Sequence, residues 1–421
     1  MTINSNNSEF DAVPKSGLLV AVGDFPGGNA TASRIKFIAR SLNEAGVATE
    51  VVLVHATLKQ AIKENNLPSG IVDGTKFQYA GGKVVRPSGF KGALFDTLQG
   101  IISTCRIIRK AKASGASFVM FYTPPSYKML FPILVAKLVA LTVIFEACEV
   151  RSKTTSAGSQ TILRRLVNSG DAMLERATPM LAGGVIPISH GIKAFYADKG
   201  MDKRRIFLLP ILVDTDLYGE KVDQPVTELV GKDYFLNSGT FNEKDGINHL
   251  VAAFEVFSKQ HQDFFLVFTG DGTEDKRKFI EAHLEDKALA GRVLFVGFLS
   301  QNELIWAYQN AKGLLSCRSN SEYANYGFPT KLGEYLSSGS PVIATRVGDV
   351  EKYLEDKVSA FIAMPESSDD IGAKLCAVAD NVSHARNVGA VGLKVALDNF
   401  DYRQYGSQLA EFIASASFRR N

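Results

Sequence analysis

The chain has 421 residues, of which 46% are apolar and 22% are charged, with 36 glycines and 14 prolines. This length predicts two domains, and the composition excludes both a disordered chain and a collagen-like fibre. Its four cysteines, Cys105, Cys148, Cys317 and Cys376, form no CxxC pair and show no metal-ligand spacing. We therefore expect reduced thiols in a cytoplasmic protein and no structural zinc site.

The net charge of +3 conceals opposite charges in the two halves of the sequence. Residues 1–210 hold 26 Lys and Arg against 14 Asp and Glu, whereas residues 211–421 hold 21 against 30. The basic first half indicates an anionic partner, such as a phosphate-bearing ligand or an anionic membrane surface. Its basic clusters fit solvated helix faces equally well. Nucleic acid is a weaker alternative and is not expected, because no recognised DNA- or RNA-binding motif is present.

The first half alternates apolar strands with helices. Residues 1–15 are polar, lack the apolar core of a secretory signal, and are expected to form a flexible tail. The apolar run 129–145 contains Pro132 and Lys137, so it is too short and interrupted for a membrane span. We expect a buried helix there that leads into a strand. The first half is predicted to contain strands at 17–23, 48–54, 117–122, 141–147 and 183–189, and an amphipathic helix at 35–46.

The second half repeats this alternation independently. Strands are predicted at 233–239, 263–270, 292–298, 311–317 and 340–346, with helices at 246–260 and 329–339 among them. The fold class is therefore α/β, with two doubly wound Rossmann-like domains that face a central cleft. We expect a flexible tail (1–15), an N-terminal domain (16–208), a C-terminal domain (209–392) and a C-terminal helix (393–421) that returns toward the N-terminal domain.

Two glycine-rich turns follow predicted strands. Gly27 and Gly28 lie after the first strand and before a helix, where a backbone without side chains lets a ligand approach and helix N–H groups attract anions. Gly270 and Gly272 follow the strand 263–270 in the same way. Neither turn is a GxGxxG motif, so a purely geometric role for these glycines stays open.

The most informative region is 318–348. A polar loop leads into a helix that begins at Pro329 and holds Glu334 one turn beyond Lys331. A helix N-terminus can hold a phosphate, and a carboxylate within the helix can accept hydrogen bonds from both hydroxyls of a ribose. This strip of chain could therefore bind a nucleotide sugar.

This region resembles the retaining GT-B glycosyltransferases, particularly glycosyltransferase family 4 (group 1), at the segment Glu-x7-Glu that is followed by Gly and Pro-Val-Ile-Ala. Glu334 matches the second Glu, and residues 337–345 match the ending. Four further segments match in the family's order, and together with the glycine-rich first loop they extend the resemblance along most of the chain. They are 186–200, 208–214, 238–254 and 296–319.

The sequence departs from the family pattern at several positions, including the hinge, where Ile211-Leu212 replaces the usual Asn-Gly. Tyr326 replaces the first Glu of the pair, which in the family addresses the donor sugar. Thr240 and Asp245 stand where the family often has Arg and Lys. Since a leaving diphosphate needs cations, we expect Lys244 and Lys331 to substitute for them.

The residue patterns and the resemblance together indicate the following site residues. The catalytic residues are Lys244, Lys331 and Glu334. Donor-binding residues are Gly239, Thr240, Gly270, Gly272, Arg318, Glu322, Tyr326, Gly327, Phe328, Pro329 and Thr330. Acceptor-binding residues are Gly27, Gly28, Asn29, Glu146, Glu149 and His190. Structural ion pairing of a glutamate with Arg151 is an equally good interpretation of the segment that holds Glu146 and Glu149.

No metal site is expected. Asp214-Thr215-Asp216 formally matches an Asp-x-Asp metal motif of another glycosyltransferase class, but it lies in the predicted hinge and the resemblance is to a metal-independent architecture. The predicted protein needs no cofactor, since a nucleotide-diphosphate sugar is its donor substrate.

The resemblance implies a hexosyltransferase-type enzyme that moves a sugar from this donor to a saccharide or lipid-linked acceptor hydroxyl in bacterial-type polysaccharide synthesis. It would be cytoplasmic, and peripheral on the inner face of the cell membrane. The alternatives are a catalytically silent nucleotide-sugar-binding protein and a nucleotide-sugar epimerase on the same fold.

Overall fold

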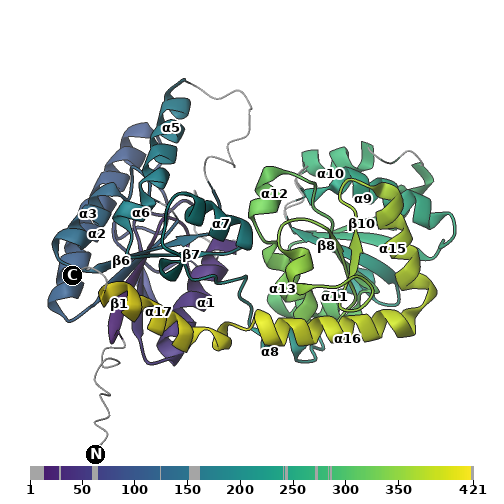
Figure 1. The fold of residues 1–421 in the computed structure, drawn as a ribbon. Helices are drawn as coiled ribbons and strands as arrows, with labels where there is room; N and C mark the ends of the chain where they lie inside the picture. The colour runs from purple at the N-terminus through teal and green to yellow at the C-terminus, as the bar shows by residue number, and fades with distance from the viewer. Residues whose placement is uncertain are drawn as a thin grey trace, which may run out of the picture. The chain divides into compact units, whose positions relative to one another are not determined.

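The protein consists of two compact units, each built on its own sheet (Figure 1). The computed structural model describes residues 14–27, 30–58, 65–123, 125–150, 162–239, 241, 245–270, 274–282, 284 and 287–418. Unit 1 comprises Met1–Leu209 and Tyr402–Asn421, and unit 2 comprises Pro210–Asp401.

Unit 1 contains a seven-stranded sheet in the order β3-β4-β2-β1-β5-β6-β7. All neighbouring strands are parallel except β3 and β4, which pair antiparallel. The central strands are almost wholly buried and rich in Val, Ile, Leu and Phe, as expected of a parallel sheet covered on both faces. The strands are β1 Ser16–Ala21, β2 Ala48–Leu53, β3 Ser69–Val72, β4 Thr75–Tyr79, β5 Phe118–Tyr122, β6 Thr142–Ala147 and β7 Gly184–Pro187.

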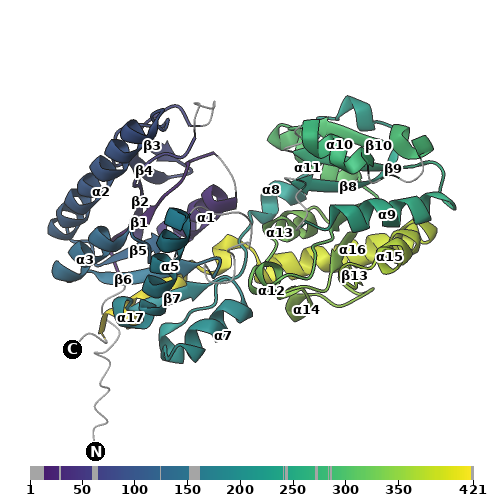
Figure 2. The same ribbon diagram turned by 90° about the horizontal axis from the view of Figure 1, so that it is seen from above.

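Helices cover both faces of this sheet. Helices α1 and α17 pack together on one face, and α2 and α3 pack together on the other (Figures 1 and 2). The C-terminal helix α17 therefore belongs to unit 1 although it follows unit 2 in the sequence. The helices are α1 Ala30–Glu44, α2 Phe90–Ala113, α3 Leu130–Leu138, α5 Ile162–Arg176, α6 Thr178–Leu181, α7 His190–Asp198 and α17 Gly406–Phe418.

Unit 2 contains a six-stranded sheet in the order β10-β9-β8-β11-β12-β13, and every neighbouring pair is parallel. This is the doubly wound order of a dinucleotide-binding fold, in which the winding direction reverses between the first and the fourth strand. The strands are β8 Asp233–Gly239, β9 Phe264–Gly270, β10 Val293–Gly297, β11 Gly313–Ser316, β12 Val342–Thr345 and β13 Phe361–Ala363.

The core of unit 2 lies between this sheet and α9 and α15. It is aromatic at one end, where Phe235, Phe257 and Phe264 pack with ring centroids 5.2 to 5.4 Å apart. The helices are α8 Thr215–Gly219, α9 Ile247–Ser258, α10 Glu274–Ala282, α11 Gln301–Asn310, α12 Glu322–Tyr326, α13 Thr330–Ser337, α14 Val350–Tyr353, α15 Ser368–Asp380 and α16 Val382–Asn399.

The predicted α/β class with two doubly wound Rossmann-like domains is confirmed, because each unit forms a largely parallel sheet wound by helices. The prediction of a buried helix within 129–145 is wrong for one face of α3. There Phe131, Leu134 and Leu138 are exposed, whereas the following strand β6 is fully buried. All four cysteines are free thiols. In the part of the chain that the structure describes, no helix combines the length and the apolar character that a membrane span requires.

Candidate functional site

The strand order of unit 2 reverses between β8 and β11, and ligands of doubly wound sheets bind at the carboxyl ends of the strands beside such a reversal. Strand β8 ends at Gly239 and β11 ends at Ser316. The segments that follow these two strands carry most of the residues predicted to bind the donor. The topology therefore brings residues far apart in the sequence to one edge of the sheet.

The backbone is closely packed at this edge. Gly270 lies opposite Gly239 in the register of β8 and β9, has a φ of +121°, and a Cβ there would lie 2.3 Å from the Gly239 carbonyl oxygen. Gly246 precedes α9 with a φ of +66°, and its Cβ would lie 2.0 Å from the carbonyl oxygen of Cys317. The turn after β9 and the start of α9 therefore both require glycine.

Helices α12 and α13 form the region that carries the Glu334 motif. The Ser321 side chain caps α12 by accepting a hydrogen bond from the Ala324 N–H at 3.1 Å. Gly327 ends α12, and α13 begins at Thr330 immediately after Pro329. The predicted helix start at Pro329 thus lies within one residue of the observed one. The open N–H groups of the first turn of α13 lie next to the 327–329 turn.

Glu334 lies on α13 and is neither buried in the core nor fully exposed. Its side chain is 20% exposed. The Lys331 Nζ donates to Glu334 Oε2 at 3.0 Å, and the Tyr308 hydroxyl donates to the same oxygen at 3.3 Å. Glu334 is therefore a carboxylate held in place by a cation and a phenol while part of its surface stays accessible.

Lys331 keeps its charge in this setting. Burial disfavours the charged form of its amine, but the carboxylate of Glu334 more than offsets this and raises the pKa of Lys331 above its ordinary value. Tyr218, on α8, is a further neighbour, and burial together with the Glu334 carboxylate raises the pKa of its hydroxyl well above the ordinary value. The site therefore presents one cation, one carboxylate and neutral phenols.

Two tyrosines connect this carboxylate to the end of β8. The Ser238 backbone N–H donates to the Tyr335 hydroxyl oxygen at 2.8 Å. The ring centroids of Tyr335 and Tyr308 lie 5.0 Å apart, edge to face. Both tyrosines are buried, so they fix α13 and α11 against the end of β8. No sequence motif points to Tyr218, Tyr308 or Tyr335, because only the fold brings them to Glu334.

The other predicted donor residues lie around the same two helices. The Arg318 guanidinium stacks over Tyr323, 5.3 Å from the ring centroid, and lies near Gly327. Glu322 is exposed at the start of α12, and Tyr326 is half-buried at its end.

The Phe328 side chain is buried against Tyr353 and Phe400, with ring centroids 5.4 and 5.6 Å away. Only its backbone can therefore face a ligand. Five predicted site residues, Gly28, Asn29, Thr240, Lys244 and Gly272, lie outside the described residues, as does Arg151.

In unit 1, the loop after β1 is fixed by residues from the region after β2. The Gly27 N–H donates to Asn65 Oδ1, and Asn65 Nδ2 donates back to the Gly27 carbonyl oxygen, both at 2.8 Å. Asn65 is fully buried, and the carboxylate of Asp24 accepts the backbone N–H groups of Thr57 and Leu58. The backbone at Gly27 is therefore held rigidly.

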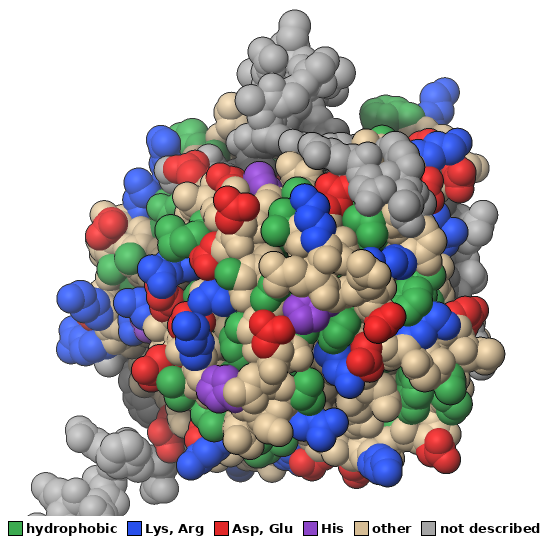
Figure 3. Space-filling model, turned by 90° about the vertical axis from the view of Figure 1, so that its right-hand side faces the viewer, with side chains coloured by type: hydrophobic (Ala, Val, Ile, Leu, Met, Phe, Trp, Pro, Cys, Tyr) green, Lys and Arg blue, Asp and Glu red, His purple; other side chains and the backbone are tan. Residues whose placement is uncertain are grey.

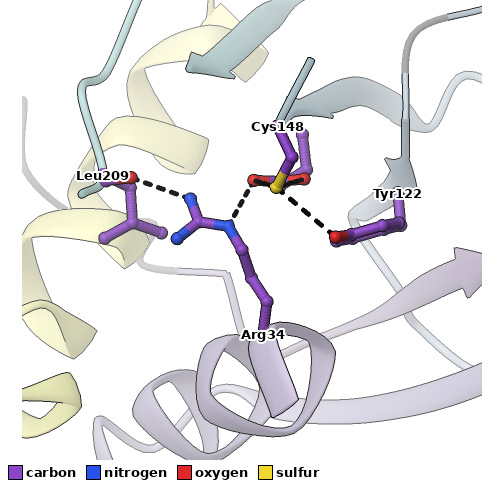
Figure 4. A network of polar contacts seen from close by, with 5 residues as sticks. Arg34, Tyr122, Cys148 and Leu209 are labelled. Carbon is purple, nitrogen blue, oxygen red and sulfur yellow. Dashed lines mark hydrogen bonds and ion pairs between the residues drawn. The ribbon is translucent and has the colours of Figure 1, made fainter. Parts of the chain in front are cut away.

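Glu146 lies at the end of β6 and is fully buried. Its Oε1 accepts from Arg34 Nε of α1 at 2.6 Å, and Arg34 donates to the Leu209 carbonyl oxygen at 2.7 Å (Figure 4). Glu146 thus pairs with a cation 112 residues away in the sequence. The Glu146 carboxylate is covered by protein, so it does not itself form part of an open surface.

Cys148 extends this buried network. Its thiol donates to both carboxylate oxygens of Glu146 at 3.2 Å, and the Tyr122 hydroxyl donates to its sulfur at 3.4 Å (Figure 4). Burial and the neighbouring carboxylate raise the pKa of the Cys148 thiol well above its ordinary value, and burial does the same for Tyr122. Both groups are therefore neutral, and the ionic part of the network is the Arg34–Glu146 pair.

Glu149 and His190, the other predicted acceptor residues, lie at the carboxyl edge of the unit 1 sheet. Glu149 is half-buried after β6, and His190 is exposed as the first residue of α7. No sequence motif singles out His55, which follows β2. It is buried, its Nε2 makes no hydrogen bond with any described residue, and burial lowers its pKa. A neutral, buried imidazole at the same edge is a further candidate group.

The Asp214–Asp216 segment has a local structural role. Thr215 hydrogen-bonds Asp401 through its hydroxyl, and Val213 pairs with Asp401 as an isolated β-bridge. Among the described residues, no group of three or more His, Cys, Asp or Glu side chains is arranged to hold a metal ion.

Comparisons with known proteins bear on the second unit and on the fold. Residues 220–394 match the family described as glycosyl transferases group 1. No curated protein matches the chain by sequence.

Solved structures match almost the whole chain. HepE from Anabaena in complex with UDP and glucose is 14% identical, with a TM-score of 0.69 over 96% of this chain and 100% of that chain. Sucrose-phosphate synthase from Thermosynechococcus elongatus is 17% identical, with a TM-score of 0.69 over 95% and 98%. WaaG, a glycosyltransferase involved in lipopolysaccharide biosynthesis, is 17% identical, with a TM-score of 0.64 over 94% and 99%. The protein therefore has the GT-B fold and resembles the group 1 glycosyltransferases, as the motifs predicted.

Proposed function

We propose, from the match of residues 220–394 to the group 1 glycosyltransferases and from the site on α13, that the protein is a glycosyltransferase of the family 4 type. It would move a hexose from a nucleotide-diphosphate donor to a hydroxyl of a saccharide or lipid-linked acceptor. The observation that carries this proposal is the partly exposed Glu334 carboxylate, held by Lys331 and Tyr308 beside the strand reversal of unit 2.

Each part of a nucleotide diphosphate has a matching group at this edge. The two ribose hydroxyls can donate to the Glu334 carboxylate, as vicinal hydroxyls do to a two-oxygen acceptor. The diphosphate can accept from the open N–H groups at the start of α13, next to Gly327 and Phe328, with Lys331 and Arg318 as nearby cations. The space that a side chain at Gly239 would fill is open, so a ligand can approach the backbone closely there. Lys244 is proposed as an additional cation.

The proposed transfer retains the anomeric configuration and needs no metal ion. The acceptor hydroxyl forms a bond to the anomeric carbon on the face from which the diphosphate leaves, and a diphosphate oxygen takes the hydroxyl proton. The breaking bond is that between the anomeric carbon and the diphosphate oxygen. Protein cations and backbone N–H groups stabilise the charge on the leaving diphosphate.

The acceptor is proposed to bind unit 1 through the loop at 27–29, Glu149 and His190. Glu146 would act only indirectly, by pairing with Arg34 inside unit 1 and holding the end of β6, because both side chains are buried. The role of WaaG in lipopolysaccharide biosynthesis supports a place for this protein in glycan synthesis. The four free thiols support a cytoplasmic setting.

Calorimetric titration with UDP-glucose and other nucleotide sugars, followed by a transfer assay, tests this proposal. The UDP and UDP-glucose complexes of HepE support starting with this donor. We expect Glu334→Gln to weaken donor binding at least tenfold, since a hydrogen bond to a charged group contributes about 1.5 to 3 kcal/mol.

The matched control is Glu351→Gln. Glu351 pairs with Arg346 at the same distance of 3.0 Å, but it lies on α14 and its side chain is 48% exposed. Donor binding by this variant should equal that of the unchanged protein. Unchanged donor affinity in Glu334→Gln, with an unchanged melting temperature, contradicts the proposal.

A catalytically silent nucleotide-sugar-binding protein is the second candidate. It is favoured by Tyr326, which stands at the position of the family's first Glu and is half-buried at the end of α12. Such a protein would bind UDP-glucose with the same dependence on Glu334 but would show neither transfer nor hydrolysis. Conversion of the donor sugar into its epimer without any acceptor would instead identify an epimerase.

A further inference from the structure

Helix α2 is oriented with its large apolar side chains away from the sheet. The face buried against unit 1 carries Asp96, Gly100, Thr104 and Ile108, which are small or polar apart from the last. A Cβ at Gly100 would lie 2.0 Å from the carbonyl oxygen of Val54, so the helix backbone lies directly on the end of β2. This is the opposite of the usual amphipathic surface helix, which buries its apolar stripe.

The outward face of α2 carries a continuous stripe. Phe95, Leu98 and Ile102 follow one another at spacings of three and four residues, and Phe95 is 65% exposed. Lys91 precedes them on the same stripe, and Arg106 and Arg109 continue it toward the C-terminus of the helix. The outward stripe is therefore apolar over its first half and cationic over its second half.

Helix α3 packs beside α2 on the same face of unit 1, as Figures 1 and 2 show. It exposes Phe131, Leu134 and Leu138, again at spacings of one helical turn, and Leu138 is 84% exposed. Together with Phe90, Leu94 and Tyr127, the α2–α3 face holds nine of the twenty large apolar side chains that are exposed among the described residues. Such clustering of exposed apolar side chains on one surface marks an interaction site.

The charges around this face have a single sign. Residues 74–145 contain ten Lys and Arg but only one acidic residue, Asp96, and Asp96 is buried. By contrast, the face of unit 2 drawn in Figure 3 intersperses Lys and Arg with Asp and Glu, and its hydrophobic side chains lie singly or in small groups. The α2–α3 face thus combines exposed apolar side chains with an excess of basic over acidic residues.

We propose that the α2–α3 face docks on an anionic lipid bilayer. Its apolar side chains would enter the boundary between headgroups and acyl chains, while the Lys and Arg of α2 contact lipid phosphates. A second copy of the chain is a poorer occupant, because Asp96 is the only acidic residue in 74–145 and is buried, so a two-fold contact of this segment would bring cations against cations. The proposal does not depend on sugar transfer.

Sedimentation of the full-length protein with vesicles tests this proposal. We expect binding to phosphatidylcholine vesicles that contain about 30% phosphatidylglycerol and little binding to phosphatidylcholine alone. Raising the salt concentration from about 0.05 M to about 0.5 M should weaken binding at least tenfold, because exposed charges are screened. Equal binding to both kinds of vesicle, or binding to neither, overturns the proposal.

Matched variants separate the two components of the face. Phe95→Ser should weaken binding to the anionic vesicles, whereas Phe298→Ser, at an aromatic residue that is 82% exposed in unit 2, should not. The double variant Arg106→Gln/Arg109→Gln should weaken binding, whereas Arg386→Gln/Lys394→Gln on α16 should not. All four carry changes at exposed side chains, and unchanged circular dichroism would verify their folds.

Two other outcomes would replace the lipid with a different partner. Sedimentation velocity that shows a dimer which Phe95→Ser dissociates would make the face a contact between copies. Binding of a duplex oligonucleotide that depends on Arg106 and Arg109 but not on Phe95, with no vesicle binding, would make it a nucleic-acid surface.

Discussion

Arg34 and Glu146 are removed from solvent, whereas Lys331 and Glu334 each keep part of the side chain exposed. The first pair is surrounded by protein on every side, so neither charge can be solvated if its partner is lost. The second pair can exchange a protein partner for a ligand or for water at modest cost. Burial therefore makes the first pair part of the structure of unit 1, and exposure leaves the second available for binding.

Glu146→Gln should destabilise unit 1 strongly. The substitution leaves the Arg34 guanidinium buried without a counter-charge, and removal of one member of such a pair typically costs about 3 to 5 kcal/mol. The expected result is a lower urea midpoint, measured by far-ultraviolet circular dichroism. Asp73→Asn is the control, because Asp73 pairs with Lys36 only at 3.6 Å and at the surface.

The control variant should change stability by less than about 1 kcal/mol. Replacing both buried charges, as Arg34→Met/Glu146→Leu, should recover much of the loss, because no isolated charge then remains. Equal stability of Glu146→Gln and Asp73→Asn would contradict this account of the network.

The sequence predicted the local part of the site and missed the distant part. Lys331 and Glu334 are three residues apart in one helix, so their proximity follows from helix geometry alone. Tyr308 reaches Glu334 across 26 residues, and Arg34 reaches Glu146 across 112. No local pattern encodes these contacts, because they depend on how α11 and α1 pack against other elements. A polar Arg34 on the buried side of α1 was the one available signal for the buried network.

At the level of elements, small residues determine how closely α2 approaches the sheet. Gly100 places the helix backbone against the carbonyl oxygen of Val54, and the Thr104 hydroxyl turns back to the Gly100 carbonyl at 2.8 Å instead of projecting toward the strands. Bulky side chains have no room on this side of the helix around Gly100. The outward position of Phe95 and Leu98 is therefore a consequence of the same close approach.

Gly100→Ala should destabilise the protein although alanine is the better helix former. The added methyl group meets backbone that cannot move aside, and overpacking of this kind costs about 1 to 3 kcal/mol. Gly170→Ala in α5 is the matched control, because a Cβ there meets nothing within 4 Å. It should stabilise the protein by up to about 1 kcal/mol. Thermal melting of both variants tests this, and shifts of the same sign would contradict the close approach of α2.

Most strands were predictable because each is a short apolar run between turn residues, as in β1, β5 and β8. The hairpin of β3 and β4 was missed, since its strands have only four and five residues and alternate between exposed and buried positions. The orientation of α2 was also missed. Periodicity shows that a helix has two faces, but which face turns inward depends on the space above the sheet.

At the scale of the whole molecule, two spectroscopic signals can distinguish the unfolding of unit 2 from that of unit 1. The only tryptophan of the chain, Trp306, lies on α11 in unit 2, whereas the backbone signal in the far ultraviolet comes from both units. Chains with two units often unfold in more than one step, so the two probes need not report the same transition. A ligand or substitution that acts on one unit can therefore be assigned to it.

UDP-glucose should raise the urea midpoint that is followed by Trp306 fluorescence, because the proposed donor site lies entirely within unit 2. A ligand at about one hundred times its dissociation constant stabilises the state that binds it by about 2.7 kcal/mol. Glu146→Gln should leave the urea midpoint of the fluorescence transition and its response to UDP-glucose unchanged. It should lower the urea midpoint of the circular dichroism transition that belongs to unit 1. Glu334→Gln should abolish the response of the fluorescence midpoint to UDP-glucose and leave the urea midpoint of unit 1 unchanged. A ligand response confined to the circular dichroism signal would instead locate the donor in unit 1, against the assignment made from β8, β11 and α13.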